Sequence, residues 1–373
     1  MTLIGDLSYS WYLWHWPLIV FAAALWPGDE GAKAVAALVS IVPAAGSYRW
    51  VERPIHLDPA WKGRRALGLA TACIAIPVVA CLVLDRAPLP HPSGSTRALL
   101  QTTHLHADRT RGCNRGLPVA EQPARCSWTV PDPQGRVVLL GDSNAGQFTE
   151  PLARASNRLG SDFTVTTLPS CPFIDTVIRG GPQDSERCRQ YVERTTRGLV
   201  ANPPSLITLG ASTSSYLRPG SPVTLTDPTT GTVASTDSDK RDAWAAALHR
   251  TLVKFERSGI PTLVVHAIPQ WLTWDARECA AIRVYLAPRT CGARQSRAAD
   301  ARFRHNALVA ESDAVRGVRT ASTVDFTDKI CQPTECVTNR KDFWVYRDGH
   351  HLSVRGALSL TDTLETALRP SLR

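Results

Sequence analysis

A serine and a histidine that lie far apart in the sequence have the neighbours that acyl-transfer chemistry requires. The tetrapeptide Gly-Asp-Ser-Asn at 141–144 follows the apolar run 137–140, and Asp348 precedes His351 in an Asp-x-x-His string near the carboxyl terminus. A serine can act as a nucleophile when a histidine takes its proton and a carboxylate orients that histidine. We therefore predict an acyl-transfer site built around Ser143 and this Asp-x-x-His string.

The position of Ser143 strengthens this prediction. A turn between an apolar strand and the helical run 147–159 exposes the hydroxyl group, and the free N–H groups of the helix start face a developing oxyanion. A Gly-Asp-Ser tripeptide is also typical of ordinary turns, so the motif alone does not establish catalysis. For Asp142 we favour the plain role of a turn residue that caps the following helix.

The elements expected around these residues form an α/β domain. Apolar runs alternate with longer amphipathic stretches, which is typical of a parallel sheet covered on both faces, with ligands beyond the carboxyl ends of the strands. We expect a long exposed loop at 215–237, because it is rich in Ser, Thr, Pro and Gly. The expected strands are 137–140, 163–168, 205–209, 261–266 and 318–324, and the expected helices are 146–158, 184–200, 238–258, 294–314 and 354–368.

The first 85 residues predict about three transmembrane helices. Apolar stretches occupy 8–26, 34–48 and 66–84, although the second is short for a bilayer. Basic residues outnumber acidic ones in 49–65, which places that loop in the cytoplasm and everything after residue 85 outside. A cleaved signal peptide is the alternative, but residues 1–7 lack its positive charges. We expect a multi-pass cell-membrane protein with an extracytoplasmic C-terminal domain.

The cysteines agree with that compartment. The chain has 10 cysteines, of which Cys73 and Cys81 lie in an apolar run. The others form locally spaced couples without a Cys-x-x-Cys motif, which favours disulfides in an oxidising compartment over a zinc site or free cytosolic thiols. Sequence alone does not fix their pairing, and we predict sequential pairs: Cys113 with Cys126, Cys171 with Cys188, Cys279 with Cys291, and Cys331 with Cys336.

The formal net charge of +9 does not by itself indicate a nucleic-acid partner. The basic residues are mostly arginine and are scattered, without a dense basic run or a nucleic-acid motif. No glycine-rich phosphate loop follows an expected strand, since the Gly-Ala-Ser at 210–212 lacks a second glycine at the required spacing. We expect no nucleic-acid partner, no cofactor and no metal.

The beginning of the chain resembles the final helices of the membrane-bound acyltransferase-3 (AT3) family. The resemblance rests on the string Gly-Asp-Leu-Ser-Tyr-Ser-Trp-Tyr-Leu-Trp-His-Trp-Pro at 5–17 and on Val-Glu-Arg-Pro at 51–54. It covers roughly residues 1–60, so the upstream AT3 helices that handle the acyl donor have no counterpart here. The chain is either a fragment or a naturally shortened protein. We expect AT3-like helices at 1–60, a further transmembrane helix at 61–85, a linker and entry segment at 86–130, and the extracytoplasmic domain at 131–373.

The rest of the chain, roughly 105–373, resembles the SGNH (GDSL-like) esterases, and its Asp348–Ser353 string resembles SGNH domains fused to AT3 proteins. This implies a three-layer, flavodoxin-like α/β fold. It also implies that Ser143 is the nucleophile, His351 the general base, and Asp348 the carboxylate that orients it. His350 is the competing base, but His351 has the spacing that the family motif requires.

One feature departs from the SGNH pattern. The family has an asparagine after its third strand, and the segment 206–213 has none. The oxyanion would then be held by the backbone N–H of Ser143, a second amide near Ser170, and a side chain such as Ser212. Losing one oxyanion donor costs on the order of a hundred- to a thousandfold in rate.

These resemblances together imply a membrane-anchored O-acyltransferase that acetylates an envelope polysaccharide through an acyl-serine intermediate. Its partners would be the membrane, a glycan acceptor and an acetyl-CoA-derived acyl donor handled by missing or separate helices. Two alternatives remain open: an extracytoplasmic carbohydrate esterase or deacetylase, and a binding module whose serine site has decayed. Trp271 and Trp274 are candidates either for stacking on a sugar ring or for filling the core.

Overall fold

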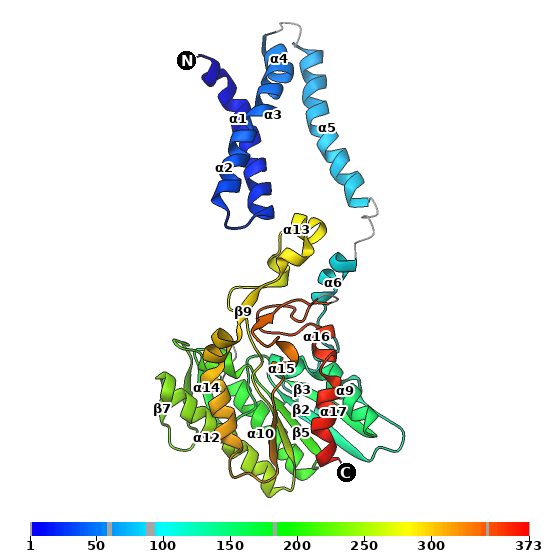
Figure 1. Ribbon diagram of the computed structural model, residues 1–373. Helices are drawn as coiled ribbons and strands as arrows, with labels where there is room; N and C mark the ends of the chain where they lie inside the picture. Colours follow the sequence, from blue (N-terminus) through cyan, green and yellow to red (C-terminus); the bar gives the residue numbers. More distant parts are fainter. Residues whose placement is uncertain (1, 58–61, 87–93, 182–184, 341–342, 373) are drawn as a thin grey trace. The chain divides into compact units, whose positions relative to one another are not determined.

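The computed structural model of the 373-residue chain describes residues 2–57, 62–86, 94–181, 185–340 and 343–372. The chain divides into two compact units (Figure 1). The first comprises residues 1–96 and 279–290, and the second comprises 97–278 and 291–373. The proline-rich start of the expected linker, at 87–93, lies outside the described residues.

The first unit is helical. Polar contacts join its helices: the Ser10 hydroxyl donates to the Glu52 carboxylate at 2.5 Å, and the Trp11 indole N–H donates to the Ser40 hydroxyl at 2.8 Å. Its helices are α1 (Thr2–Leu25), α2 (Glu30–Val39), α3 (Ile41–Ser47), the π-helical turn Tyr48–Glu52, α4 (Arg53–Leu57), α5 (Arg64–Arg86) and α13 (Ala281–Leu286).

Two helical stretches among the described residues are long and apolar enough to cross a bilayer. They are Glu30–Ile55, with 26 residues, and Arg64–Val83, with 20. Two of the three expected transmembrane stretches, 34–48 and 66–84, thus overlap helices that meet this criterion, whereas α1 does not meet it. Much of the exposed surface of α1 is contributed by Tyr and Trp rings, whose O–H and N–H groups prefer the membrane interface to the hydrocarbon.

A six-stranded sheet forms the centre of the second unit. Its strands lie in the order β1-β3-β2-β5-β8-β10 and are parallel except for β1, which pairs antiparallel with β3. The domain is thus α/β as predicted, but its sheet is mixed rather than wholly parallel. The strands are β1 (Ser127–Trp128), β2 (Gly135–Gly141), β3 (Ser161–Thr167), β5 (Leu206–Gly210), β8 (Thr262–Val265) and β10 (Ala321–Val324).

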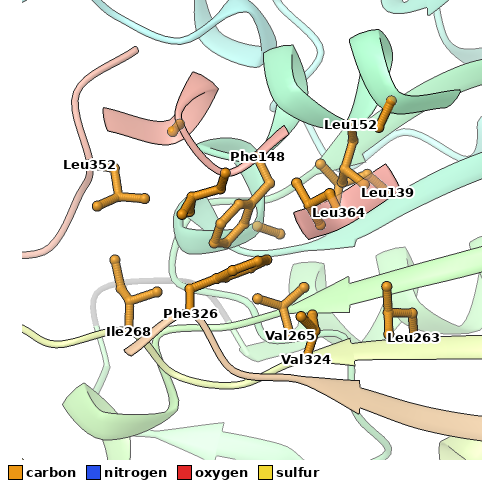
Figure 2. Close-up of a cluster of buried hydrophobic side chains, with 14 of the residues drawn as sticks. Leu139, Phe148, Leu152, Leu263, Val265, Ile268, Val324, Phe326, Leu352 and Leu364 are labelled. Atoms are coloured by element: carbon orange, nitrogen blue, oxygen red, sulfur yellow. The ribbon is translucent and has the colours of Figure 1, made fainter. Parts of the chain in front are cut away.

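Alternating side chains of β2 face two separate cores, because successive residues of a strand point to opposite faces of its sheet. Val137 and Leu139 belong to the core under the helices α9 (Thr149–Arg158) and α17 (Thr361–Leu368). Val138 and Leu140 belong to the core under α10 (Ser185–Ala201), α12 (Asp237–Arg257) and α14 (Arg297–Val315). The residues of both cores are almost fully buried, and Figure 2 shows part of the first core, where Phe148 packs against Phe326. Both faces of the sheet are covered, as the alternation of elements predicts.

The helices of the second unit follow the predicted order with two interruptions. The helix expected at 146–158 is divided into α8 and α9, and the one expected at 354–368 is divided into α16 and α17. The helices are α7 (Ala107–Thr110), α8 (Ser143–Gly146), α9 (Thr149–Arg158), α10 (Ser185–Ala201), α11 (Thr213–Leu217), α12 (Asp237–Arg257), α14 (Arg297–Val315), α15 (Thr327–Ile330), α16 (Val354–Leu358) and α17 (Thr361–Leu368). The helix α6 (Gly94–Thr102) precedes them.

Two small antiparallel sheets were not predicted. One contains β4 (Val177–Arg179), β6 (Thr224–Thr226) and β7 (Val233–Ala234), and the other pairs β9 (Arg294–Ser296) with β11 (Glu335–Val337). The segment 215–237 is therefore not simply an exposed loop. Leu225 is fully buried within it. Its alternation with Thr224 and Thr226 is a strand pattern, but the pattern is too short to stand out from the polar residues around it.

Disulfides occur where the sequence predicts them. Cys113 bonds to Cys126, Cys171 to Cys188, and Cys331 to Cys336. Cys279 and Cys291 are disulfide-bonded as well, whereas Cys73 and Cys81 are free. The bonds Cys113–Cys126, Cys171–Cys188 and Cys331–Cys336 join residues 13, 17 and 5 positions apart, so each closes a short loop.

Candidate active site

The serine is positioned by the central strand β2. Ser143 is the first residue of α8, directly after the β2–Asp142 turn at the carboxyl end of the sheet. Its N–H is the first amide of α8, so no earlier turn of that helix carries an acceptor for it. The hydroxyl and a free amide of one residue therefore lie at the edge where ligands of such sheets bind.

Gly141 is required at the end of β2 for two reasons. Its φ of +140° lies in a region that L side chains rarely adopt, and an added Cβ would lie 1.8 Å from the carbonyl oxygen of Gly210 on β5. The tight approach of the two backbones fixes where the turn to Ser143 begins.

Asp142 caps the turn and joins it to the neighbouring strand. Its carboxylate accepts the backbone N–H of Asn144 at 2.7 Å and that of Ser212 at 2.9 Å, together with the Tyr216 hydroxyl at 3.3 Å. The capping role expected from the sequence is correct, and the second bond ties the serine turn to β5. Burial raises the pKa of Asp142 to about 6, against the opposing effect of these hydrogen bonds.

A continuous chain of hydrogen bonds connects Ser143 to the Asp-x-x-His string. The Ser143 hydroxyl lies 2.9 Å from Nε2 of His351, and Nδ1 of His351 lies 2.8 Å from Oδ1 of Asp348. An ionised carboxylate can only accept, so Nδ1 carries the proton and Nε2 is left to accept from the serine. The structure brings together the three residues that the sequence singled out, whereas His350 contributes its backbone N–H to Asp348 at 3.0 Å.

The electrostatics of this chain favour a neutral imidazole beside an ionised carboxylate. Burial lowers the pKa of His351 below its usual value and outweighs the opposing effect of the Asp348 charge. Burial alone would raise the pKa of Asp348, but the hydrogen bond and charge of His351, together with the charge of Arg347, hold it well below its usual value. At neutral pH the Nε2 atom is therefore free to take a proton from Ser143.

The segment that carries His351 has no regular secondary structure and is held by side chains from distant parts of the chain. Gln147 accepts the Leu352 N–H at 2.7 Å, and Nε2 of His106 lies 2.9 Å from the Leu352 carbonyl oxygen. The other His106 nitrogen lies 2.7 Å from the Glu150 carboxylate on α9. His106 is 2 % exposed, so these contacts form a buried clamp on the residue after His351.

The clamp residues were not predicted from the sequence. His106 lies in the segment expected to be a linker, and an isolated histidine between polar residues gives no periodic signal. Its contact partner is 246 residues away, which no local pattern reveals. Ala107–Thr110 is helical at this point and packs on the domain, so the expected entry segment contributes directly to the site.

A cavity of about 490 Å³ opens beside the serine. The residues that line it include Ser143, Ser170, Ser212 and His351. Ser170 has a φ of +59°, a conformation that a non-glycine residue rarely adopts and that is commonly found at functional sites. The rim is completed by residues of the 215–237 segment, among them Arg218 and Ser221.

Ser212 is already committed to other partners. Its N–H donates to Asp142, and its hydroxyl accepts from the Gln270 amide at 2.9 Å. The Ser215 hydroxyl donates to the Gln270 carbonyl oxygen at 2.9 Å, so the remaining 2.7 Å contact between the two serines uses the Ser212 proton. Ser212 follows β5, the third parallel strand in chain order, where the SGNH pattern has an asparagine that this sequence lacks.

The two tryptophans of the segment after β8 serve mainly to fill the core. Trp271 is 5 % exposed and packs edge-on against Tyr346, and Trp274 stacks on Trp344 with an angle of 5° between the rings. The core-filling alternative is therefore correct for Trp271. Both residues also line a second cavity, to which His350 and His351 contribute as well.

Comparison with known proteins identifies a family for the second unit. The family model described as "SGNH domain (fused to AT3 domains)" matches residues 109–366, so the N-terminal helices lie outside the match. Among solved structures, the periplasmic domain of a lipopolysaccharide acetyltransferase from Salmonella ser. Paratyphi A is similar at 13 % identity and a TM-score of 0.43, over 70 % of this chain and 87 % of that chain. A putative SGNH hydrolase from Slackia heliotrinireducens is similar at 14 % identity and a TM-score of 0.39, over 62 % and 98 % of the two chains. No curated protein matches the chain.

Proposed function

This chain belongs to the family of SGNH domains that are fused to AT3 domains, and we propose that it is an O-acyltransferase that moves an acetyl group onto an envelope polysaccharide. The observation that carries the proposal is the hydrogen-bonded series from Ser143 through His351 to Asp348, which borders a cavity large enough for a sugar. Ser143 is the proposed nucleophile, His351 the general base and Asp348 the orienting carboxylate.

In the first half-reaction the Ser143 oxygen attacks the acyl carbonyl carbon of the donor while Nε2 of His351 takes the serine proton. The bond between the carbonyl carbon and the donor oxygen then breaks, and the imidazolium returns the proton to the leaving oxygen. The product is an acyl-serine ester. Asp348 stabilises the transient imidazolium and keeps the Nδ1 proton facing it.

In the second half-reaction a sugar hydroxyl takes the place of the donor. His351 removes its proton, the sugar oxygen attacks the acyl-serine, and the Ser143 oxygen leaves with the proton from the imidazolium. Hydrolysis differs only in that water replaces the sugar. The same residues therefore serve a transferase and an esterase, and access of the acceptor decides between them.

The charge that develops on the carbonyl oxygen requires donors. We assign the backbone N–H groups of Ser143 and Ser170 to this role, because both residues line the cavity and Ser170 is held in a strained backbone conformation there. The Ser212 hydroxyl joins them only if its bond to Ser215 opens. This arrangement lacks the asparagine of other SGNH proteins and predicts a slower enzyme.

We further propose that the domain lies outside the cytoplasm, anchored by the N-terminal helices. The disulfides require an oxidising compartment, and two described stretches of the first unit are long and apolar enough to span a bilayer. The AT3-like strings at 5–17 and 51–54 support membrane helices that accept acyl groups from elsewhere. The acyl donor is then an acetyl-CoA-derived species delivered through membrane helices.

Labelling with a fluorophosphonate probe tests the nucleophile. The full-length protein in detergent should label, Ser143→Ala should not, and the exposed-site control Ser235→Ala should label like the wild type. Absence of labelling in the wild type would favour the decayed binding module, for which the missing asparagine and the closed Ser212 ring are the supporting observations.

A second measurement separates transfer from hydrolysis. The protein is incubated with p-nitrophenyl acetate and an oligosaccharide, and mass spectrometry follows acetylation of the sugar. Acetylated sugar supports the transferase. Release of acetate at an unchanged rate with no acetylated sugar would support the esterase.

A further inference from the structure

A second cavity adjoins the one that contains Ser143. It has a volume of about 420 Å³, and both cavities are lined by His350 and His351. Three segments build its walls: the entry segment with Leu105 and Arg109, the segment 271–278 after β8, and the string 347–351. A molecule bound at Ser143 therefore has a second binding space directly beyond the histidine pair.

The charges that line this second cavity balance. Three arginines, Arg109, Arg277 and Arg347, are matched by three carboxylates, Asp275, Glu278 and Asp348. Arg277 pairs with Asp275, and Arg347 pairs with Asp348. A cavity that selects an anion has an excess of cations, and one that selects a cation has the reverse. The balance of signs favours a neutral ligand with many hydrogen-bonding groups.

The same walls offer apolar contacts beside the polar ones. Leu272 is 60 % exposed, Leu105 is 47 % exposed, and Trp274 is partly buried at the cavity wall. Trp274 is held rigidly, because it stacks on Trp344 and donates its indole N–H to the Cys291 carbonyl oxygen at 2.7 Å. Apolar side chains interleaved with both donors and acceptors match a sugar, whose C–H surfaces and hydroxyl groups alternate.

The wall of the second cavity contacts the segment that carries Asp348 and His351. The backbone N–H of Trp271 donates to the Gly349 carbonyl oxygen at 2.8 Å, and a Cβ on Gly349 would lie 2.2 Å from the Trp271 carbonyl oxygen. The wall of the second cavity and the segment that carries His351 are thus one packed surface. A ligand held in the second cavity is held at a fixed position relative to Nε2 of His351.

We propose that the second cavity binds a neutral sugar residue that neighbours the acetylated one, so that the acceptor is an oligosaccharide rather than a single sugar. This inference rests on the proposed function in assigning the chemistry at Ser143. It adds a binding site that distinguishes polymeric acceptors from monomeric ones. Arg277 and Leu272 are the accessible contacts of this site, and His350 separates it from the serine cavity.

Binding to the full-length Ser143→Ala protein tests the inference without requiring catalysis. Calorimetry compares glucose, maltose and maltotetraose, the corresponding β-1,4-linked series, and an oligogalacturonate of the same length. We expect the tetrasaccharide of at least one neutral series to bind about tenfold more tightly than its monosaccharide, the equivalent of one well-placed hydrogen bond to a charged group. Adding Arg277→Ala or Leu272→Ala should remove most of that advantage.

Arg316→Ala is the matched control. Arg316 is exposed and pairs with Asp313, a carboxylate nearby in the sequence, as Arg277 pairs with Asp275. It should leave the chain-length advantage intact. Equal affinity for monomer and tetramer in every neutral series, or an advantage that survives Arg277→Ala and Leu272→Ala, would overturn the proposal. Preferential binding of the oligogalacturonate would overturn the assignment of a neutral ligand.

Acetyl transfer by the wild-type protein is measured together with binding. The two measurements then distinguish failure of the proposed chemistry at Ser143 from failure of the proposed second sugar site. Length-dependent binding without any acetyl transfer from p-nitrophenyl acetate would retain the sugar site and discard the proposed chemistry. Acetyl transfer to glucose and maltotetraose with equal kcat/KM, together with length-independent binding, would retain the chemistry and discard the second site.

Discussion

The serine side and the histidine side of the site are built in different ways. Ser143 follows the central strand β2, whose residues are buried between two cores and hydrogen-bonded to strands on both sides. His351 lies in an irregular segment held by single contacts: side-chain bonds from His106 and Gln147 to Leu352, and a backbone bond from the Trp271 N–H to Gly349. The position of Ser143 is fixed by the many packing contacts and hydrogen bonds of the sheet. The position of His351 is fixed by only a few individual hydrogen bonds. The histidine side should therefore be the one that isolated substitutions disturb without unfolding the domain.

The most damaging substitution on the histidine side should be Asp348→Asn. An amide cannot hold the Nδ1 proton in place as the carboxylate does, so the imidazole adopts the wrong tautomer for accepting the serine proton. We expect kcat for p-nitrophenyl acetate to fall about 10⁴-fold, the loss seen when a serine protease triad is changed in this way.

The control for this change is Asp362→Asn, whose side chain is 91 % exposed. It should retain wild-type kcat. A loss of less than tenfold in Asp348→Asn would contradict the assignment of Asp348 as the orienting carboxylate.

On the serine side the sensitive position is Gly141. The substitution Gly141→Ala places a methyl group 1.8 Å from the Gly210 carbonyl oxygen at an unfavourable φ, so β2 and β5 must separate. We expect a loss of about 3 kcal/mol in the free energy of unfolding, measured by denaturant titration.

Gly220→Ala provides the comparison, because Gly220 has a φ of +70° with no atom within 4 Å of the added Cβ. It should cost about 1 kcal/mol from backbone strain alone. Similar losses for the two variants would mean that the contact with Gly210 does not constrain the serine turn.

The clamp on the histidine side is tested by His106→Ala. Loss of the imidazole leaves the buried Leu352 carbonyl without this donor, while Glu150 keeps the Ala107 N–H at 2.8 Å. We expect a cost of about 2 kcal/mol in stability and a fall of about tenfold in kcat, because His351 is displaced relative to Ser143.

His104→Ala, at an exposed position two residues earlier, should change neither quantity. A lowered stability with an unchanged kcat in His106→Ala would show that the clamp supports the fold but not the position of His351.

The smallest expected effect is a shift in the pH dependence of the rate on p-nitrophenyl acetate. Because the folded protein lowers the pKa of His351, the neutral form persists below the usual histidine pKa of about 6.5. The rate on p-nitrophenyl acetate should thus rise with pH through a midpoint below that value. The same shift makes His351 cost stability as pH falls from 6.5 through the folded pKa, since the unfolded chain binds the proton first. A midpoint at or above 6.5 would contradict the burial of His351.

Local patterns determined the fold class and most elements of the second unit. The five expected strands are present. Four of them, β2, β3, β5 and β8, have mostly buried residues, whereas only Val324 is buried in the edge strand β10. The patterns failed where elements are short or edge-located. The two-residue strand β1 carries no periodic signal, and the strand β6 lies in a segment whose threonines and prolines suggest a loop. At the amino terminus, two of the three expected spans overlap helices that are long and apolar enough to cross a bilayer, and the aromatic-rich α1 does not meet that criterion.

The sequence by itself determined the chemistry that is available: a serine after a buried strand, an Asp-x-x-His string near the end, and eight cysteines in neighbouring pairs, because each of these signals is local. Only the tertiary structure decided that Nε2 of His351 meets Ser143 across 208 residues, that Asp142 is shared between two strands, and that a second cavity lies beyond the histidine pair. Those features depend on which distant backbones pack together. Packing is set by the summed burial of many side chains rather than by any motif that contains them.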